Sequence, residues 1–301
     1  MKLLTGTSHP KLAAAISKLL KVPLSAMDIR HFACNEIYAK PAKSVRGDDV
    51  FVIQTGTQNV NEELIELFIM LDSLKRSSAA KVHVVMPYFP YSRQDRVATP
   101  HEPITAKLMA DLVSKAGADH LITFTLHSDQ EQGFFDFPVD NLSARLLFVE
   151  YFKKKNIKNL TVVAPDIGSA KEALRFAKHL NAELAILNKL RPAPNVSEIT
   201  HIVGSVNNRT CIIYDDLVDT GGSVVNAAAI LKKHGAQKDI YLAATHPVLS
   251  LDASKKLQSA GFKEIVFTDT IPIPAEKMLK NMKIISVAPL LADFIQHVHE
   301  S

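Results

Sequence analysis

The chain has 301 residues, of which 47% are hydrophobic and 22% charged, and its 15 proline and 11 glycine residues are ordinary numbers for a globular protein. This composition excludes disordered, collagen-like and solenoid-biased chains, and the length suggests about two domains, because single cores rarely grow much beyond ~250 residues. The net charge of +4 is too small to indicate nucleic-acid binding, and a mildly basic enzyme that handles phosphates has the same balance.

The cysteines and the apolar runs of the sequence exclude further classes of protein. Cys34 and Cys211 are the only cysteines, so the sequence has neither a disulfide framework nor a Cys-x-x-Cys metal site. The first residues become polar too early for a signal peptide, and the longest apolar runs fall well short of the ~18 residues that a membrane span requires. We therefore expect a cytoplasmic enzyme that contacts no membrane.

Short β-branched runs alternate along the chain with longer segments of helical periodicity. The expected buried strands are Asp49–Gln54, Lys81–Met86, His120–Thr125, Asn159–Ala164, Thr210–Tyr214, Asp239–Thr245, Glu264–Thr268 and Lys283–Val287. Apolar residues recur at helical spacing over residues 62–75 and 223–234, and Gly235 is placed to end the second of these helices. Alternating strands and helices predict mostly parallel sheets covered by helices on both faces.

A weak internal repeat indicates how the chain is organised. The strand–helix–strand unit of residues 49–86 matches that of residues 210–245, although any two βαβ units look alike and the repeat alone leaves both explanations open. We expect two similar α/β domains, residues 1–145 and 146–287, with a C-terminal helix at about residues 288–301 packed on the first.

The loop over residues 215–223, Asp-Asp-Leu-Val-Asp-Thr-Gly-Gly-Ser, lies between an expected strand and an expected helix. The carboxyl end of a parallel strand is where α/β folds bind ligands. Gly221 and Gly222 allow the backbone to approach a ligand closely. Thr220, Ser223 and the first N–H groups of the helix would form an anion site, aided by the helix dipole.

An acidic pair, Asp215 and Asp216, opens this loop, and Asp219 follows within it. Carboxylates are poor neighbours for a bare phosphate, but they accept hydrogen bonds from sugar hydroxyls while the phosphate lies further along the loop. The loop therefore predicts a sugar phosphate, most economically a ribose 5-phosphate. An acidic helix-capping loop that binds nothing is the alternative. Since the sequence has neither a Walker A motif nor a G-x-G-x-x-G fingerprint, any nucleotide must be held in another way.

The same loop resembles the phosphoribosyl-pyrophosphate loop of type I phosphoribosyltransferases and of phosphoribosyl-pyrophosphate synthetases. Further segments resemble the synthetases, in order and over nearly the whole chain: Ser8–Pro10, Ser44–Gly47, Pro87–Asp95 (Pro-Tyr-Phe-Pro-Tyr-Ser-Arg-Gln-Asp), Glu102–Lys107, Leu126–His127, Gln132–Phe135, Pro138–Asn141, Pro165–Gly168 and Thr268–Pro272. The resemblance implies two similar phosphoribosyltransferase-like domains, each a mostly parallel twisted sheet flanked by helices.

The resemblance also implies a reaction. A ribose-phosphate diphosphokinase transfers the β,γ-diphosphoryl group of ATP to the anomeric hydroxyl of ribose 5-phosphate, giving phosphoribosyl pyrophosphate and AMP. It implies that Lys189 and Arg191 are catalytic, as a basic pair at the root of a loop that closes over the triphosphate. It assigns His127 and Asp166 to Mg²⁺ on the ATP side, where a carboxylate is a usual ligand and a histidine acts through water.

The nucleotide contacts are implied in the same way. Phe32 and Glu36 match the adenine-contacting segment of the family, which a neighbouring subunit supplies, while Arg93 and Gln94 would bind the ATP phosphates and the adenine. A shared site of this kind implies a homodimer or a homohexamer. Phe32 as a core residue is the alternative interpretation.

Several positions depart from the family pattern. Cys34 replaces an aspartate of the adenine segment, and Ser169 and Glu172 replace a glycine and an arginine. These changes leave three alternatives open: the same chemistry on another acceptor such as ADP-ribose, a phosphoribosyltransferase, and a non-catalytic partner of an active synthetase. Because the basic pair and the ribose-phosphate loop are kept, we favour an active synthetase.

Overall fold

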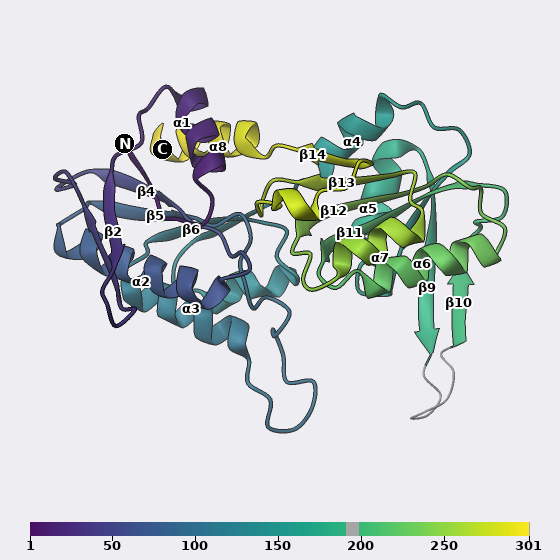
Figure 1. The fold of residues 1–301 in the computed structure, drawn as a ribbon, viewed down its shortest axis with the longest axis horizontal. Helices are drawn as coiled ribbons and strands as arrows, with labels where there is room; N and C mark the ends of the chain where they lie inside the picture. Colours follow the sequence, from purple (N-terminus) through teal and green to yellow (C-terminus); the bar gives the residue numbers. More distant parts are fainter. Residues whose placement is uncertain (191–198, 301) are drawn as a thin grey trace. The chain divides into compact units, whose positions relative to one another are not determined.

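A computed structural model describes residues 1–190 and 199–300 (Figure 1). The chain divides into two compact units. The first consists of Met1–Ser143, Thr270–Pro272 and Ser286–Ser301, and the second of Ala144–Asp269 and Ile273–Ile285.

The first unit contains a five-stranded parallel sheet in the order β1-β4-β5-β6-β7. Its strands are β1 (Lys2–Thr5), β4 (Asp49–Ile53), β5 (Lys81–Val85), β6 (His120–Phe124) and β7 (Val139–Leu142). Its helices are α1 (Pro10–Leu20), α2 (Val60–Arg76), α3 (Thr105–Ala116), α8 (Ala288–Glu300) and the 3₁₀ turn η1 (Asp129–Phe134).

Strand alternation decides how helices cover this sheet. Val50 and Val52 point to one face and pack against Leu67 and Leu71 of α2, while Phe51 points to the other. α1 and α8 pack against each other on that other side of the sheet (Figure 1). An antiparallel hairpin of β2 (Met27–His31) and β3 (Ile37–Pro41) packs against α2.

The loop between β4 and α2 is closed by glutamates of its own helix. The Thr57 N–H donates to Glu63 Oε2 at 2.6 Å, and the Thr57 hydroxyl donates to the same carboxylate. The Thr7 N–H and hydroxyl donate to the two oxygens of Glu66 at 2.7 and 2.8 Å. Both glutamates are buried. Carboxylates of α2 therefore lie against amides of two loops, at Thr57 between β4 and α2 and at Thr7 between β1 and α1.

The second unit contains a seven-stranded sheet in the order β10-β9-β8-β11-β12-β13-β14, parallel except for β10. Its strands are β8 (Leu160–Ala164), β9 (Glu183–Leu190), β10 (Ile199–Val203), β11 (Thr210–Val218), β12 (Ile240–Pro247), β13 (Glu264–Thr268) and β14 (Met282–Ile285). Its helices are α4 (Arg145–Lys153), α5 (Ala170–Leu180), α6 (Gly222–Lys233), α7 (Ala253–Ala260) and the 3₁₀ turn η2 (Ala275–Lys277).

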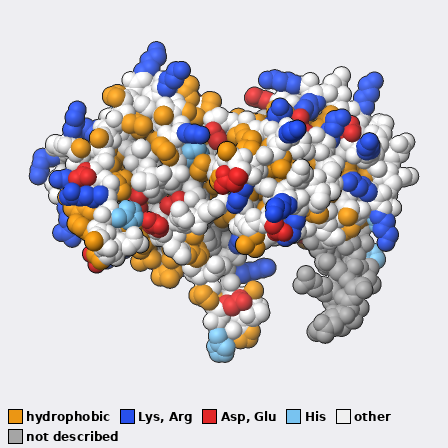
Figure 2. Space-filling view, in the orientation of Figure 1, with side chains coloured by type: hydrophobic (Ala, Val, Ile, Leu, Met, Phe, Trp, Pro, Cys, Tyr) orange, Lys and Arg blue, Asp and Glu red, His pale blue; other side chains and the backbone are white. Residues whose placement is uncertain are grey.

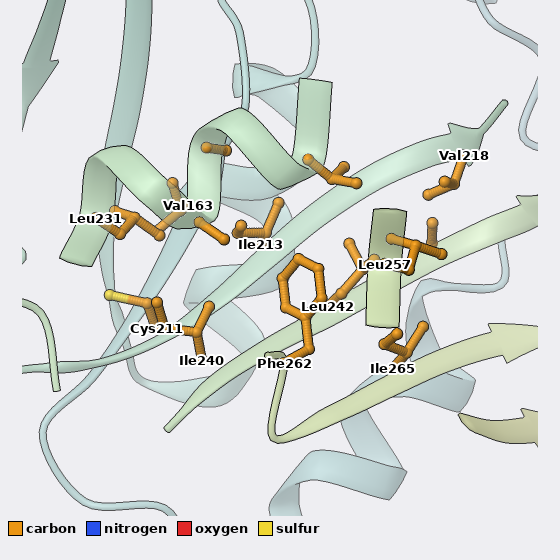
Figure 3. Close-up of a cluster of buried hydrophobic side chains, with 14 of the residues drawn as sticks. Val163, Cys211, Ile213, Val218, Leu231, Ile240, Leu242, Leu257, Phe262 and Ile265 are labelled. Carbon is orange, nitrogen blue, oxygen red and sulfur yellow. The ribbon is translucent and has the colours of Figure 1, made fainter. Parts of the chain in front are cut away.

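Two apolar layers cover this sheet. On one face, aliphatic side chains of the central strands, among them Ile213 and Leu242, pack with Leu231 of α6 and Leu257 of α7 (Figure 3). On the other face the layer is aromatic, and the Tyr214 ring stacks on Phe176 of α5 with centroids 4.4 Å apart. Neighbouring residues of β11 therefore serve opposite cores, which fixes the register of the strand that leads to the ribose-phosphate loop.

The predicted fold class is confirmed, and each expected strand lies over a strand of the structure. The prediction that the central strand ends at Tyr214 is wrong, because β11 continues to Val218. Leu217 and Val218 are buried, and pairing with β12 extends as far as Pro247. Six strands (β1, β2, β3, β7, β9 and β10) were not expected.

Surface charge and helix composition relate to the prediction that the protein binds neither nucleic acid nor a membrane. On the face drawn in Figure 2, lysine and arginine side chains are scattered over both units among acidic and uncharged ones. Within residues 1–190 and 199–300, no helix has the length and apolar character that crossing a membrane would need.

Candidate active site

The ribose-phosphate loop is shorter than the sequence suggested. Asp215 and Asp216 are half-buried in the last part of β11, and Asp219–Gly221 alone connect the strand to α6. Gly221 precedes the first turn of α6 with φ of 75°, a left-handed conformation that favours glycine. The turn therefore presents the N-terminus of α6 directly beside the acidic end of β11.

Three carboxylates meet at this edge of the sheet. β8 and β11 are parallel neighbours with Val163 opposite Ile213, so Asp166, just beyond β8, comes to the same edge as Asp215 and Asp216. Burial raises the pKa of Asp215 well above its ordinary value, and the negative charges of Asp216 and Asp166 raise this pKa further. A hydroxyl donor or a cation at this place would relieve that repulsion.

The expected metal ligands lie in different units. Asp166 is exposed and accepts a hydrogen bond from the Ser169 N–H at 3.0 Å, and His127 is exposed just beyond β6 of the first unit. Among the described residues, no group of three or more His, Cys, Asp and Glu side chains is arranged to hold a metal ion. A Mg²⁺ ion bound through one or two carboxylates and substrate phosphates needs no such group, so the acidic edge fits Mg²⁺.

The expected adenine contacts lie at the exposed end of the β2–β3 hairpin. Phe32 is 49% exposed, with its ring edge-on to Tyr38 at 6.0 Å, and Glu36 and Cys34 are also exposed. The Phe32 N–H donates to the Glu36 carbonyl at 2.9 Å, which holds the turn closed. The interpretation of Phe32 as a core residue is wrong, because half of this aromatic ring faces solvent.

Arg93 and Gln94 are exposed in the segment between β5 and α3. The amide oxygen of Gln94 accepts a hydrogen bond from the Thr105 hydroxyl at 2.6 Å, and its carbonyl accepts one from the Ala106 N–H at 3.2 Å. Gln94 therefore caps the start of α3, a local role that the sequence motif did not reveal.

The expected catalytic pair is described only in part. Lys189 lies in β9, opposite Thr200 of the antiparallel β10. Arg191 lies outside the described residues.

The charge change at Glu172 is compensated locally. Its carboxylate accepts a hydrogen bond from Arg145 of α4 at 2.6 Å, and a second arginine, Arg175, contacts its other oxygen. The negative charge that departs from the family pattern is thus held by two cations of the same unit.

A mostly parallel sheet with a ligand-accessible strand end beside a glycine-opened helix is typical of α/β proteins that bind phosphorylated ligands. Comparison with known proteins gives the family. The family model of the N-terminal domain of ribose phosphate pyrophosphokinase matches residues 1–117, and that of the phosphoribosyl synthetase-associated domain matches residues 189–301.

Two relatives and one solved structure resemble the chain over nearly its full length. It is 46% identical to a ribose-phosphate pyrophosphokinase of Caldanaerobacter subterraneus subsp. tengcongensis and 45% identical to one of Bacillus caldolyticus, in both cases over 100% of this chain and 95% of the relative. The structure of phosphoribosylpyrophosphate synthetase from Mycobacterium smegmatis matches with a TM-score of 0.94 at 40% identity, over 99% of this chain and 98% of that one. The chain belongs to the ribose-phosphate pyrophosphokinase family.

Proposed function

We propose that this protein is a ribose-phosphate diphosphokinase, which transfers the β,γ-diphosphoryl group of ATP to the anomeric hydroxyl of ribose 5-phosphate. Family membership over the whole chain supports this reaction. The observation that carries it is the acidic end of β11 beside the start of α6, because one short segment offers acceptors for sugar hydroxyls and donors for an ester phosphate.

In this proposal the second unit binds the sugar. Asp215 and Asp216 accept hydrogen bonds from the ribose hydroxyls, and the segment from Asp219 to Ser223, with its two glycines and the first amides of α6, binds the phosphate. Asp216 already has its Oδ1 bonded to the Leu217 N–H at 2.8 Å, which orients its carboxylate at the strand end.

The nucleotide is bound by the first unit in the same proposal. Phe32 stacks on adenine, Glu36 accepts from its amino group, and Arg93 and Gln94 bind the phosphates and the base. His127 and Asp166 would hold Mg²⁺, which offsets charge on the triphosphate and on the transferring group.

Lys189 and Arg191 are assigned to catalysis because two cations near the transferred group stabilise the charge that develops there. The exposed Phe32 hairpin would complete the nucleotide site of a neighbouring copy, as a homodimer or homohexamer in the cytoplasm.

The reaction can be tested directly. Purified protein with Mg²⁺, ATP and ribose 5-phosphate is expected to release AMP and phosphoribosyl pyrophosphate in equal amounts. The Lys189→Ala variant is expected to lose ~10²-fold or more of this rate, which excludes a contaminating enzyme as the source.

Replacing ribose 5-phosphate by ADP-ribose tests the acceptor. We expect little AMP from ADP-ribose, since the Glu172 charge is paired with Arg145 and Arg175 and creates no new acceptor site. Faster AMP release with ADP-ribose, or none with either acceptor, would refute the proposal.

A further inference from the structure

The turn that follows β12 is bonded to the backbone of the ribose-phosphate loop. The Leu249 N–H donates to the Val218 carbonyl at 3.0 Å, and the Ser250 N–H donates to the Asp219 carbonyl, also at 3.0 Å. These two bonds join residues that are about thirty positions apart in the sequence and fix two successive peptide planes of the loop.

Fixing the carbonyls also fixes the amides. A trans peptide is planar, and its C=O and N–H point in opposite directions. Because the Val218 and Asp219 carbonyls face the turn, the N–H groups of Asp219 and Thr220 are directed away from it. The turn therefore determines where two amides of the ribose-phosphate loop point.

The turn is not a conformation that its residues prefer. Leu249 has φ of 49° and Leu251 has φ of 52°, a region in which a branched side chain is strained. Leu249 is buried, but the Leu251 side chain is 84% exposed and gains little from burial. Something outside the turn must stabilise it.

Lys277 supplies that support. It is the last residue of η2, it is half-buried, and its Nζ donates to the Leu249 carbonyl at 2.7 Å. Its own carbonyl accepts from the Ser254 hydroxyl of α7 at 2.8 Å, which holds η2 against that helix. The peptide group between Leu249 and Ser250 is therefore bonded on both sides. Its carbonyl accepts from Lys277, and its N–H donates to the Asp219 carbonyl of the ribose-phosphate loop.

We propose that Lys277 is a positioning residue for ribose 5-phosphate: through the Leu249–Ser250 turn it orients the Asp219 and Thr220 amides toward the ester phosphate. This inference rests on the proposed function of the loop. Lys277 itself need not contact the substrate. It preorganises the loop in the conformation that binds phosphate. Its effect therefore belongs to sugar binding rather than to nucleotide binding.

The test is steady-state kinetics with each substrate varied in turn. In Lys277→Met, which keeps the length of the side chain and removes the donor, we expect KM for ribose 5-phosphate to rise about tenfold. KM for ATP and kcat should change less than about twofold. Lys277→Arg, which restores a cationic donor, should return KM for ribose 5-phosphate to near the value of the unmodified protein.

Lys256→Met is the matched control. Lys256 lies on the neighbouring α7 and pairs with Asp252 at 2.9 Å, and both side chains are about half exposed. We expect this variant to leave all three kinetic constants unchanged. If Lys277→Met lowers the melting temperature but leaves KM for ribose 5-phosphate unchanged, or if it shifts both KM values equally, Lys277 has a general structural role and the inference is wrong.

A substitution in the loop itself separates this outcome from a failure of the proposed function. Gly221→Ala introduces a side chain at φ of 75° and should raise KM for ribose 5-phosphate whether or not Lys277 acts as proposed. No effect of Gly221→Ala would place the sugar elsewhere and remove the basis for both proposals. An effect of Gly221→Ala without one of Lys277→Met would overturn only the role of Lys277.

Discussion

Asp215 lies where burial and two neighbouring carboxylates oppose its ionisation. Its pKa is raised in the folded protein, so between the ordinary value and the raised value the folded state binds more protons than the unfolded state. Stability therefore falls as the pH rises through this interval, and above it the ionised carboxylate destabilises the free protein. The residue is retained at a cost to stability, which is typical of a group that meets its partner in the substrate.

Asp215→Asn should separate these two effects. The change removes the charge and keeps the size, so we expect the melting temperature of the free protein at pH 7 to rise by roughly 2 °C or more. The same change should lower kcat/KM for ribose 5-phosphate by on the order of 10²-fold, through the loss of charged hydrogen bonds. Scanning calorimetry and the AMP assay measure the two quantities.

Asp239→Asn is the control for this prediction. Asp239 pairs with Lys263 at 3.4 Å on the surface, and both side chains are about half exposed, so neither quantity should change appreciably. A loss of stability in Asp215→Asn together with unchanged kinetics would show that the carboxylate has a structural role only.

Single strands and turns mark the limit of what the sequence predicts. The buried strands were found because they are β-branched runs, whereas β7 (Val-Asp-Asn-Leu) is a polar edge strand and resembles a loop. The end of β11 was misplaced because two aspartates are an ordinary loop signal, and only pairing with β12 keeps them in the strand. The contacts of Leu249 and Ser250 involve backbone atoms, for which no side-chain pattern exists.

Site residues show the same division. The loop from Asp215 to Ser223 was recognisable because its residue types carry the chemistry. The approach of Asp166 to Asp215 depends on β8 and β11 being neighbours, which strand order decides and local sequence does not. Resemblance to a family gave these residues, and the strand order of the second unit explains why Asp166 lies near Asp215.

Three adjacent strands of the first unit carry a row of polar side chains, of which the two histidines are buried. His83 Nδ1 of β5 lies 3.0 Å from His120 Nδ1 of β6, and His120 Nε2 lies 2.8 Å from Asp140 Oδ2 of β7. The His83 ring stacks on Phe51 of β4 with centroids 4.3 Å apart. Burial, followed by the charge of His120, lowers the pKa of His83 to about 4.

A pH dependence follows from this row. The unfolded state binds a proton at His83 below about pH 6.5, but the folded state does so only near pH 4, so His83 destabilises the fold increasingly as the pH falls through this interval. We expect the melting temperature to fall less steeply between pH 6.5 and pH 4 in His83→Gln than in the unmodified protein. Parallel curves for the two proteins would contradict this assignment.

The residues proposed to bind the two substrates belong to different units of the molecule. Phe32, Glu36 and Arg93 belong to the first unit, and the loop from Asp215 to Ser223 belongs to the second. Two substrates that bind to different units should slow amide hydrogen exchange in different segments of the chain. β4–α2–β5 and β11–α6–β12 are both parallel βαβ units, one in each compact unit of the chain.

Hydrogen exchange measures which backbone amides each substrate protects. Ribose 5-phosphate is expected to slow amide exchange in residues 215–223 and 248–251 of the second unit. A non-hydrolysable ATP analogue with Mg²⁺ is expected to slow exchange in residues 30–37 and 93–96 of the first. If ribose 5-phosphate alone protects residues 30–37, the sugar binds to the first unit, and our assignment of the sugar to the second unit is wrong.

Two glutamates of α2 bind amides of two loops in the first unit, the β4–α2 loop and the β1–α1 loop. Glu63 and Glu66 are built-in anions, and they already engage the amides of Thr57 and Thr7. An incoming phosphate ester would have to displace covalently tethered carboxylates from these loops. Binding of a phosphate at these amides of the first unit would therefore require the loss of hydrogen bonds that the protein already makes with its own carboxylates.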